Sequence, residues 1–421
     1  MIVMKILWLC NVILPPIACE IGAPTPTGGG WLTGAANAIL KKKDIQLAVC
    51  FPQRKSAGLL KGCVDKLSYY GFPSNKEPHI YDENITVWYK KILDDYQPDI
   101  VHIWGTEYPH SLAMTKAFGK PDKTIINIQG LCSFITEHYC AFLPEKARKA
   151  WTIRDFLRQD RIVEQQKKFR LRGKMEAQAL QNAGLIVGRT RWDRACAWQL
   201  APQAAYRFCN ETLRDVFYEN AGAWTVENCE KHSLFVSQSS YPIKGFHLVL
   251  EAMPEILKRY PDARLYTTGP DPFTIPFYRV SGYQTYLKKL ISRLHLREKV
   301  IFLGGLDAAS MCSRFLRSQV FVCPSSIENS PNSVAEAMLL GVPTVASYVG
   351  GTMDLLKDKE EGYLYQPDAT YMLAHYVCKV FEEEETSFQM GQKASQHALK
   401  THDPQTNFGC MMKIYDEVYK S

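Results

Sequence analysis

Short runs of apolar residues alternate along most of the chain with longer segments in which apolar residues recur every three or four positions. The short runs have the length of buried strands and the longer segments have the period of helices, so the pattern predicts repeated β/α units around parallel sheets. The first half of the chain has expected strands at residues 5–10, 45–51, 100–104, 124–128 and 185–188. The second half has them at residues 234–236, 264–268, 300–303, 320–323, 344–346 and 363–365.

Helical segments separate the strands most regularly in the second half, at residues 246–259, 283–294, 308–317 and 333–340. Two series of β/α units in one chain predict an α/β protein with two doubly wound, Rossmann-like domains. Ligands of open α/β sheets bind outside the carboxyl ends of the strands, so two such sheets facing each other would form a binding cleft.

The join between the two expected domains falls in residues 203–231, a polar segment with several aromatic residues and no clear period. We place the boundary after residue 226, which gives a first domain of residues 1–226 and a second of residues 227–402. Residues 403–421 form an expected helix whose apolar side chains share one face; these are Phe408, Met411, Met412 and Tyr415. The pattern allows this helix either to cross back to the first domain or to pack on the second.

The composition narrows the class of protein. With 421 residues, the chain is long enough for two or three domains with cores of their own. Its 13 cysteines contain no C-x-x-C pair, which argues against a disulfide framework and a zinc site and fits a reducing cytosol. An apolar run at residues 6–18 has the character of a signal peptide, but we expect a buried strand that runs into a proline-containing loop. No run reaches the roughly 18–20 apolar residues of a membrane span.

The candidate chemistry lies in residues 320–351, which read VFVCPSSIENSPNSVAEAMLLGVPTVASYVGG. The pattern predicts a strand, a polar loop, and a helix that begins near Asn332 or Ser333. Glu328 lies in the loop and Glu336 lies on the helix, eight positions later. The free N–H groups and the positive dipole end at the start of a helix suit a diphosphate. Glu336 could then accept hydrogen bonds from a ribose diol, and Glu328 could reach the sugar beyond the phosphates.

This unit resembles the E-x7-E region of the family-4 retaining glycosyltransferases, and the likeness covers residues 233–368. It includes Lys244-Gly245 and Gly269-Pro270, each after an expected strand, and Gly350-Gly351 downstream. The resemblance implies a GT-B fold, in which two Rossmann-like domains face each other across a cleft. It further implies that the second domain binds a nucleotide sugar and that the first domain lies on the acceptor side.

The resemblance implies transfer of a sugar, with retention of the anomeric configuration, from a UDP- or GDP-sugar to a saccharide or lipid-linked acceptor. The product would be a cell-surface polysaccharide or glycolipid. Because no Asp-x-Asp motif occurs in the chain, we expect transfer without a metal, and we expect no cofactor. Two alternatives stay open: a sugar-nucleotide epimerase, and a non-catalytic nucleotide-sugar-binding protein on the same scaffold.

The resemblance implies catalytic roles for Glu328, which would hold the sugar hydroxyls, and for Lys244, which would neutralise the diphosphate. Glu336 would bind the ribose. Gln238 stands where family members often carry an arginine, and its amide can donate hydrogen bonds but carries no charge. The remaining expected donor contacts are Gly29, Gly30, Gly269, Asn329, Ser330, Asn332, Ser333, Gly350 and Gly351.

Polar residues near the ends of expected strands in the first domain are candidates for acceptor contacts. They are Glu107, His110, Gln129 and His138. Gln129 stands where many members of the family carry a histidine that bonds the donor sugar, so that role is not carried over. His102 lies inside an apolar run, and we expect it to be a hydrogen-bonded core histidine.

Positive charge is concentrated in residues 141–176, which hold 11 Lys and Arg against 5 Asp and Glu. Between residues 146 and 174, basic and apolar residues recur at helical spacing and predict an amphipathic helix. Its basic face is either simply solvated or attracted to an anionic membrane surface or an acidic acceptor. Nucleic acid is not an expected partner, since no recognition motif accompanies the charge. The expected location is the cytoplasm, with peripheral attachment at the inner face of a membrane.

Overall fold

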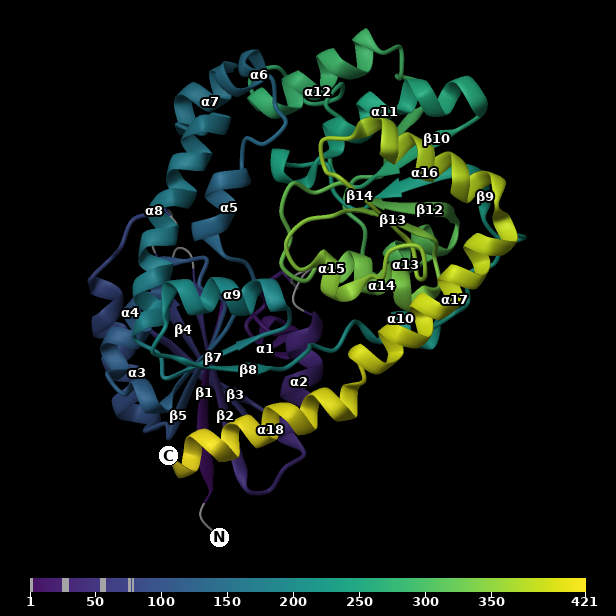
Figure 1. The fold of residues 1–421 in the computed structure, drawn as a ribbon. Helices are drawn as coiled ribbons and strands as arrows, with labels where there is room; N and C mark the ends of the chain where they lie inside the picture. The colour runs from purple at the N-terminus through teal and green to yellow at the C-terminus, as the bar shows by residue number, and fades with distance from the viewer. Residues whose placement is uncertain (1–2, 25–29, 54–57, 75–76, 78) are drawn as a thin grey trace. The chain divides into compact units, whose positions relative to one another are not determined.

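The computed structural model describes residues 3–24, 30–53, 58–74, 77 and 79–421 (Figure 1). Internal contacts divide the chain into two compact units. The first unit consists of Met1–Phe134, Lys168–Thr212 and His402–Ser421. The second consists of Ile135–Lys167 and Leu213–Thr401. The chain therefore passes between the units four times.

The first unit is built on an eight-stranded sheet in the order β3-β4-β2-β1-β5-β6-β7-β8. All neighbouring strands are parallel except β3 and β4, which form an antiparallel pair at one edge. The strands are β1 (Met4–Cys10), β2 (Ile45–Gln53), β3 (Leu60–Val64), β4 (Leu67–Pro73), β5 (Ile100–Trp104), β6 (Thr124–Asn127), β7 (Leu185–Gly188) and β8 (Ala205–Phe208).

Alternate side chains of β1 enter the two cores that lie on opposite faces of this sheet, as the pleat of a strand requires. One core also contains side chains from α1 (Pro15–Glu20), α2 (Gly30–Leu40) and α18 (Pro404–Lys420). The other contains side chains from α3 (Asn84–Tyr96), α4 (Pro109–Phe118), α8 (Ile162–Gln181) and α9 (Arg191–Leu200). A short 3-10 turn, η1 (Pro121–Lys123), precedes β6.

The second unit is built on a six-stranded parallel sheet in the order β11-β10-β9-β12-β13-β14. The strands are β9 (Glu230–Val236), β10 (Arg264–Thr267), β11 (Val300–Phe302), β12 (Ser318–Cys323), β13 (Thr344–Ser347) and β14 (Tyr363–Tyr365). The helices between them are α11 (Phe246–Arg259), α12 (Gly282–Arg293), α13 (Ala308–Leu316), α14 (Asn332–Leu340) and α15 (Thr352–Leu355). The flanking helices are α5 (Cys132–His138), α6 (Glu145–Lys149), α7 (Ile153–Arg158), α10 (Asp215–Glu219), α16 (Thr370–Glu382) and α17 (Glu384–Thr401).

The expectation of two doubly wound sheets is confirmed. Every strand expected from the sequence is present, and its ends differ from the predicted ones by a few residues at most. Three strands of the first unit were not predicted: β3, β4 and β8. β3 and β8 are the two edge strands of the sheet, and most residues of β8 are exposed. Neither strand therefore shows the continuous apolar run of a strand that is buried on both faces.

The segment between residues 135 and 167 differs most from its expected place. The sequence assigned it to the first domain, whereas its contacts lie in the second unit, where α6 contacts α12. The expected single amphipathic helix is broken into α6, α7 and the start of α8, and Gln159 ends α7 with a left-handed φ of 48°.

Residues 213–226 also belong to the second unit, whereas the predicted boundary after residue 226 assigned them to the first domain. Phe217 and Trp224 are fully buried in the core beneath α14, and the Trp224 indole donates to the carbonyl oxygen of Ser318 at 2.8 Å. The apolar residues of this segment are too irregularly spaced to mark it as part of a core.

Helix α18 packs on the first unit, which is one of the two placements that the sequence left open. Tyr415 is fully buried, and its hydroxyl accepts a hydrogen bond from the Trp8 indole at 2.9 Å. The same hydroxyl lies 2.7 Å from Nδ1 of His102. Burial lowers the pKa of His102 to about 3, so the ring is neutral and can accept from the hydroxyl. The expectation of a hydrogen-bonded core histidine is confirmed.

Candidate functional site

The strand order of the second sheet reverses between β9 and β12, which are neighbours although they are not consecutive. Such a switch point leaves a crevice at the carboxyl ends of the two strands, where ligands of doubly wound sheets bind. The loop after β9 ends in η2 (Pro242–Lys244), and the loop after β12 contains Glu328. The two residues expected to be catalytic therefore lie at the switch point.

Lys244 and Glu328 form an ion pair across this crevice. Their Nζ and Oε1 atoms are 2.6 Å apart, and the hydroxyl of Ser325 donates to the same carboxylate oxygen at 2.7 Å. The Lys244 side chain is 26% exposed and that of Glu328 is 12% exposed, so the pair is partly accessible. Burial opposes the charge of Lys244, but the Glu328 carboxylate outweighs this effect and raises the pKa of Lys244 above its ordinary value.

Two glycines allow the loops to approach closely enough to form this pair. A Cβ on Gly245, whose φ is 67°, would lie 1.8 Å from the carbonyl oxygen of Pro324. A Cβ on Gly350, whose φ is 50°, would lie 2.0 Å from the carbonyl oxygen of Glu328. Gly351 donates its N–H to that same carbonyl at 3.0 Å. The Gly351 amide, expected to contact a donor, is thus engaged in holding the Glu328 loop.

The start of α14 offers a helix N-terminus beside Glu328. Pro331 stands at the N-cap and has no side-chain oxygen with which to cap the helix, and the uncharged residues Asn332 and Ser333 open the first turn. Asn329 and Ser330 precede it and are largely buried. The backbone N–H groups at the start of a helix and its positive dipole end form a binding site for anions such as phosphate.

Glu336, one turn into α14, forms a two-pronged ion pair with Arg214. The Nε and Nη2 atoms of Arg214 donate to its two carboxylate oxygens, each at 2.7 Å. The guanidinium also lies over the ring of Phe217, 4.6 Å from its centroid. Burial raises the pKa of Glu336, and the charge and hydrogen bonds of Arg214 oppose that rise. Sequence reasoning missed Arg214, because it lies in an aperiodic segment outside the family motif.

The other expected donor residues of the second unit lie along the same edge of the sheet. Gln238, after β9, donates its amide to the Tyr241 hydroxyl at 2.8 Å. Gly269, after β10, has a φ of 106° and donates its N–H to the Gly304 carbonyl at 2.9 Å. In the first unit, Gly30 is the first residue of α2, whereas Gly29 lies outside the described residues.

The first sheet has its own switch point, between β1 and β5, and polar residues meet there. Nδ2 of Asn11, after β1, donates to Oε2 of Glu107, after β5, at 3.2 Å. The other carboxylate oxygen of Glu107 accepts from the Gly130 amide at 2.9 Å. Nε2 of His110 lies 2.6 Å from Oδ1 of Asn11. The structure therefore joins Glu107 and His110, and adds Asn11, which sequence reasoning missed.

Burial shapes the charges of this second cluster. It raises the pKa of the Glu107 carboxyl, which the Gly130 and Asn11 donors and the nearby Arg172 partly counteract. It lowers the pKa of His110 to about 3, with help from the charge of Arg172. The His110 ring is therefore neutral near pH 7 and donates to the Asn11 oxygen through Nε2.

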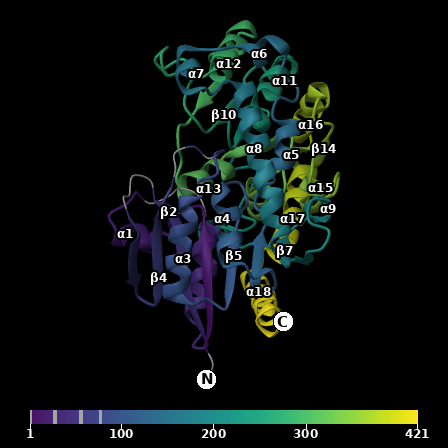
Figure 2. The ribbon, with the colours of Figure 1, turned by 90° about the vertical axis from the view of Figure 1, so that its left-hand side faces the viewer.

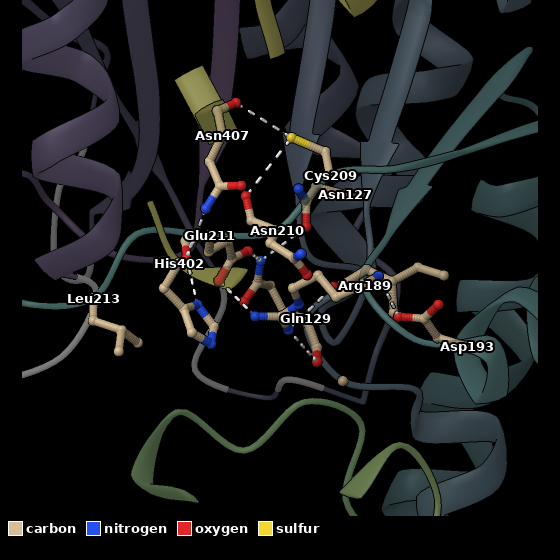
Figure 3. Close-up of polar contacts among 12 residues, drawn as sticks. Asn127, Gln129, Arg189, Asp193, Cys209, Asn210, Glu211, Leu213, His402 and Asn407 are labelled. Atoms are coloured by element: carbon tan, nitrogen blue, oxygen red, sulfur yellow. Dashed lines mark hydrogen bonds and ion pairs between the residues drawn. The ribbon is translucent and has the colours of Figure 1, made fainter. Parts of the chain in front are cut away.

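Gln129 does not join this cluster. Figure 3 shows it pointing toward Arg189 and Glu211, at the ends of β6, β7 and β8. Arg189 and Glu211 form a buried ion pair of 2.6 Å, and the Gln129 amide donates to the same carboxylate. The carbonyl of Glu211 lies 2.8 Å from Nδ1 of His402, just before α18. Glu211 therefore links the segment after β8 and the segment before α18 to the first sheet.

His138 belongs to the second unit, where its carbonyl oxygen accepts from the Ser326 hydroxyl at 3.2 Å. The candidate acceptor residues thus fall into three separate places. Within the part of the chain that the structure describes, no three His, Cys, Asp or Glu side chains are grouped closely enough to hold a metal ion.

The chain is similar in sequence to glycosyltransferases over part of its length. Residues 223–397 match the model of the family described as Glycosyl transferases group 1. An uncharacterised glycosyltransferase of Methanocaldococcus jannaschii is 32% identical over 158 residues, which are 38% of this chain and 37% of that protein. The phosphatidyl-myo-inositol mannosyltransferase of Mycobacterium tuberculosis is 28% identical over 243 residues, 55% of this chain and 60% of that protein. Neither match covers two thirds of the relative's own length.

The fold is similar over nearly the whole chain. The crystal structure of Anabaena HepE in complex with UDP-glucose superimposes with a TM-score of 0.67 and 16% identity, covering 98% of this chain and 99% of that one. At this identity the likeness concerns the fold alone. The two Rossmann-like sheets of the chain are those of a GT-B fold, as the sequence resemblance implied.

Proposed function

We propose that this protein is a glycosyltransferase that moves a sugar from a nucleotide-diphosphate sugar to a saccharide or lipid-linked acceptor. One observation carries the proposal: Lys244 and Glu328 meet at the switch point of the second sheet, beside the start of α14. The match of residues 223–397 to the Glycosyl transferases group 1 family supports it. So do a relative that is a mannosyltransferase of a phospholipid and a neighbour of similar fold that binds UDP-glucose.

The donor diphosphate would bind between the Lys244 ammonium and the N–H groups at the start of α14. Breaking the glycosidic bond leaves a more negative diphosphate, so a fixed cation and oriented amides stabilise the transition state more than the bound donor. The Glu336 carboxylate would accept from the ribose hydroxyls. The donor would be a UDP- or GDP-sugar.

Glu328 would change partners during binding. Its carboxylate is held by Lys244 and Ser325 in the structure. A diphosphate with its greater charge competes for Lys244, which leaves the Glu328 oxygen free to accept hydrogen bonds from the hydroxyls of the sugar. The ion pair thus holds both side chains in place until the donor arrives.

The finer assignments belong to the same proposal. We assign Glu328 and Glu336 to the E-x7-E pair of a family-4 enzyme that retains the anomeric configuration. Because the chain has no Asp-x-Asp motif for a metal-bound diphosphate, Lys244 and α14 would replace the metal in neutralising the leaving group. No further cofactor is assigned.

The acceptor would contact the cluster of Asn11, Glu107 and His110 on the first sheet. These side chains offer a carboxylate, an amide and a neutral imidazole, which are groups that hydrogen-bond sugar hydroxyls. Gln129 is not included, because its amide is directed at the buried Glu211. The resulting product would be a cell-surface polysaccharide or glycolipid.

A lipid-linked acceptor would bring the protein to the inner face of a membrane. No helix among the described residues is long and apolar enough to cross a bilayer. We propose peripheral attachment through basic side chains, because residues 141–176 carry a large excess of positive charge. Replacing the basic residues Arg148, Lys149, Lys167, Lys168 and Arg170 by Gln should weaken binding to anionic vesicles, most strongly at low salt.

The transferase proposal is tested by measuring which nucleoside diphosphate is released from a panel of UDP-, GDP- and ADP-sugars. We expect slow hydrolysis of one donor in water and faster turnover with an acceptor. Glu328→Gln should lower this release roughly 100-fold while the variant stays folded. Tight donor binding without turnover would instead indicate a non-catalytic binding protein, and conversion of the sugar without release of nucleotide would indicate an epimerase.

A further inference from the structure

Helix α7 turns an apolar face toward solvent. Ile153, Phe156 and Leu157 are spaced i, i+3 and i+4, so their side chains share one side of the helix. Their exposed fractions are 49%, 74% and 75%, and Trp151, just before the helix, is 66% exposed. A folded protein rarely leaves several large apolar side chains together in water, so this face indicates a binding surface.

The polar side of α7 is the side that holds it to the second unit. Asp155 is almost fully buried, and its carboxylate accepts from the Gly282 amide, at the start of α12, at 2.7 Å. The Thr152 hydroxyl caps α7 by accepting from the Asp155 amide at 3.1 Å. These bonds hold the polar side of α7 against the second unit and leave its apolar side chains exposed. Figures 1 and 2 show the backbone of α7 close to α6 and α12.

The unpaired exposed charge of α6 and α7 is positive. Lys146 and Arg148 on α6 and Arg158 on α7 are exposed and have no ion-pair partner among the described residues. The acidic residues nearby are neutralised: Glu145 pairs with Lys149 at 2.5 Å, and Asp160 pairs with Arg154 at 2.8 Å.

We propose that the apolar face of α7 inserts into the interfacial layer of an anionic bilayer, with Lys146, Arg148 and Arg158 against the lipid phosphates. A tryptophan beside aliphatic and aromatic residues, on helices that also carry exposed and unpaired basic groups, has the chemistry of a membrane-surface segment. A second copy of the chain fits less well, since a two-fold interface through this face would bring like charges together.

This inference rests on the membrane partner of the proposed function and adds a second, apolar component to it. Attraction by basic residues alone is screened by salt, whereas apolar insertion is not. The two components, and the transferase activity, can therefore be tested separately.

The test is co-sedimentation of the full chain with vesicles of phosphatidylcholine, alone or with about 30% phosphatidylglycerol. The double variant Phe156→Ser, Leu157→Ser should partition about 10-fold or more weakly onto the anionic vesicles, also at high salt. Trp198→Ser is the matched control, because Trp198 on α9 is 74% exposed and lies outside this face; it should bind as the wild type does. Hydrolysis of the donor without vesicles should be the same in all three proteins, which shows that the variants are folded.

Equal partitioning of the double variant and the wild type would overturn the inference, even if loss of basic charge still weakened binding. Equal binding to neutral and anionic vesicles would also overturn it, because the basic side chains of α6 and α7 would then have no role. Concentration-dependent dimers that disappear in the double variant, without vesicle binding by the wild type, would assign the face to a second copy instead. Failure of donor hydrolysis in every protein would contradict the transferase proposal and leave this result intact.

Discussion

Burial raises the pKa of the Glu336 carboxyl, and Arg214 opposes that rise. The two carboxylate oxygens of Glu336 are both held by Arg214, and that guanidinium is itself supported by the ring of Phe217. A paired arginine and carboxylate leave lone pairs of the carboxylate oxygens in a fixed direction for a third partner. In the proposed donor complex, Arg214 would therefore act through Glu336, as a positioning residue for the ribose.

Replacing Arg214 by Met should shift the pH dependence of donor binding. Burial already raises the pKa of Glu336 and Arg214 opposes that rise, so without the guanidinium the pKa moves further up. Because the carboxylate is the form that accepts from a diol, the donor KM should increase about 10-fold near pH 7 and recover as the pH is raised. Arg214→Lys should restore part of the loss. A KM profile that keeps its position on the pH axis in the Met variant would refute the positioning role.

Lys244 and Glu328 should respond oppositely to substitution. In the structure they neutralise each other, and the donor diphosphate would compete with Glu328 for the ammonium. Lys244→Met should weaken binding of UDP or GDP about 10-fold or more, whereas Glu328→Gln should leave it equal or tighter while lowering kcat roughly 100-fold. Isothermal titration and donor turnover measure the two effects. Lys231→Met, which breaks the exposed pair of Lys231 with Glu384, is the matched control and should change neither.

If both variants lost nucleotide affinity to the same extent, the proposed competition between Glu328 and the diphosphate for Lys244 would be refuted. If neither did, the diphosphate would bind elsewhere in the protein.

The loops that carry these side chains are shaped by glycine. At Gly350 both the positive φ and the approach of the Glu328 carbonyl exclude a side chain, and at Gly245 the Pro324 carbonyl does the same. The position of Glu328 thus depends on the backbone of the segment after β13 as much as on its own loop.

Gly350→Ala should destabilise the second unit by about 2–3 kcal/mol and reduce donor turnover, because the new Cβ forces the Glu328 loop to move. Thermal unfolding and turnover together measure this. Gly409→Ala is the opposite control: Gly409 lies inside α18 with nothing within 4 Å of a new Cβ, so it should be neutral or stabilising by about 0.5–1 kcal/mol. Equal unfolding temperatures for Gly350→Ala and the wild type would contradict the proposed crowding.

The hydroxyl of Tyr415, on α18, bonds side chains of two strands of the first sheet, Trp8 on β1 and His102 on β5. Tyr415→Phe removes the acceptor of the Trp8 indole and the donor to His102, and so leaves two buried polar groups without partners. We expect a loss of about 1–3 kcal/mol in the stability of the first unit, seen as a lower unfolding temperature. Tyr419→Phe, at a half-buried position near the end of the same helix, should have little effect. Comparable losses in the two variants would show that the buried contacts of Tyr415 are not special.

The sequence predicted the second sheet almost completely, since its strands contain short apolar runs that are separated by regular helices. It also named Lys244 and Glu328 before the structure placed them together. It could not name Arg214 or Asn11, because each is a lone polar residue whose partner lies about a hundred positions away. Contacts of that kind leave no local pattern.

Each of the two compact units is built from stretches of chain that are not contiguous in the sequence. A single boundary cannot describe a chain whose residues 135–167 and 213–226 join the second unit and whose last helix joins the first. Both sheets nevertheless place polar side chains at their switch points, where a doubly wound topology opens a crevice. The family match covers only residues 223–397, whereas the fold likeness covers nearly the whole chain. We therefore expect residues of the second unit to determine which donor is bound, and residues of the first unit to determine which acceptor is bound.

The most direct test of this account is the crystal structure of the chain with the nucleoside diphosphate that it binds. We expect phosphate oxygens on the Lys244 ammonium and on the N–H groups at the start of α14, and ribose hydroxyls on Glu336. We also expect the Lys244–Glu328 pair to be opened beyond its present 2.6 Å. A nucleotide bound elsewhere, with that ion pair intact, would contradict it.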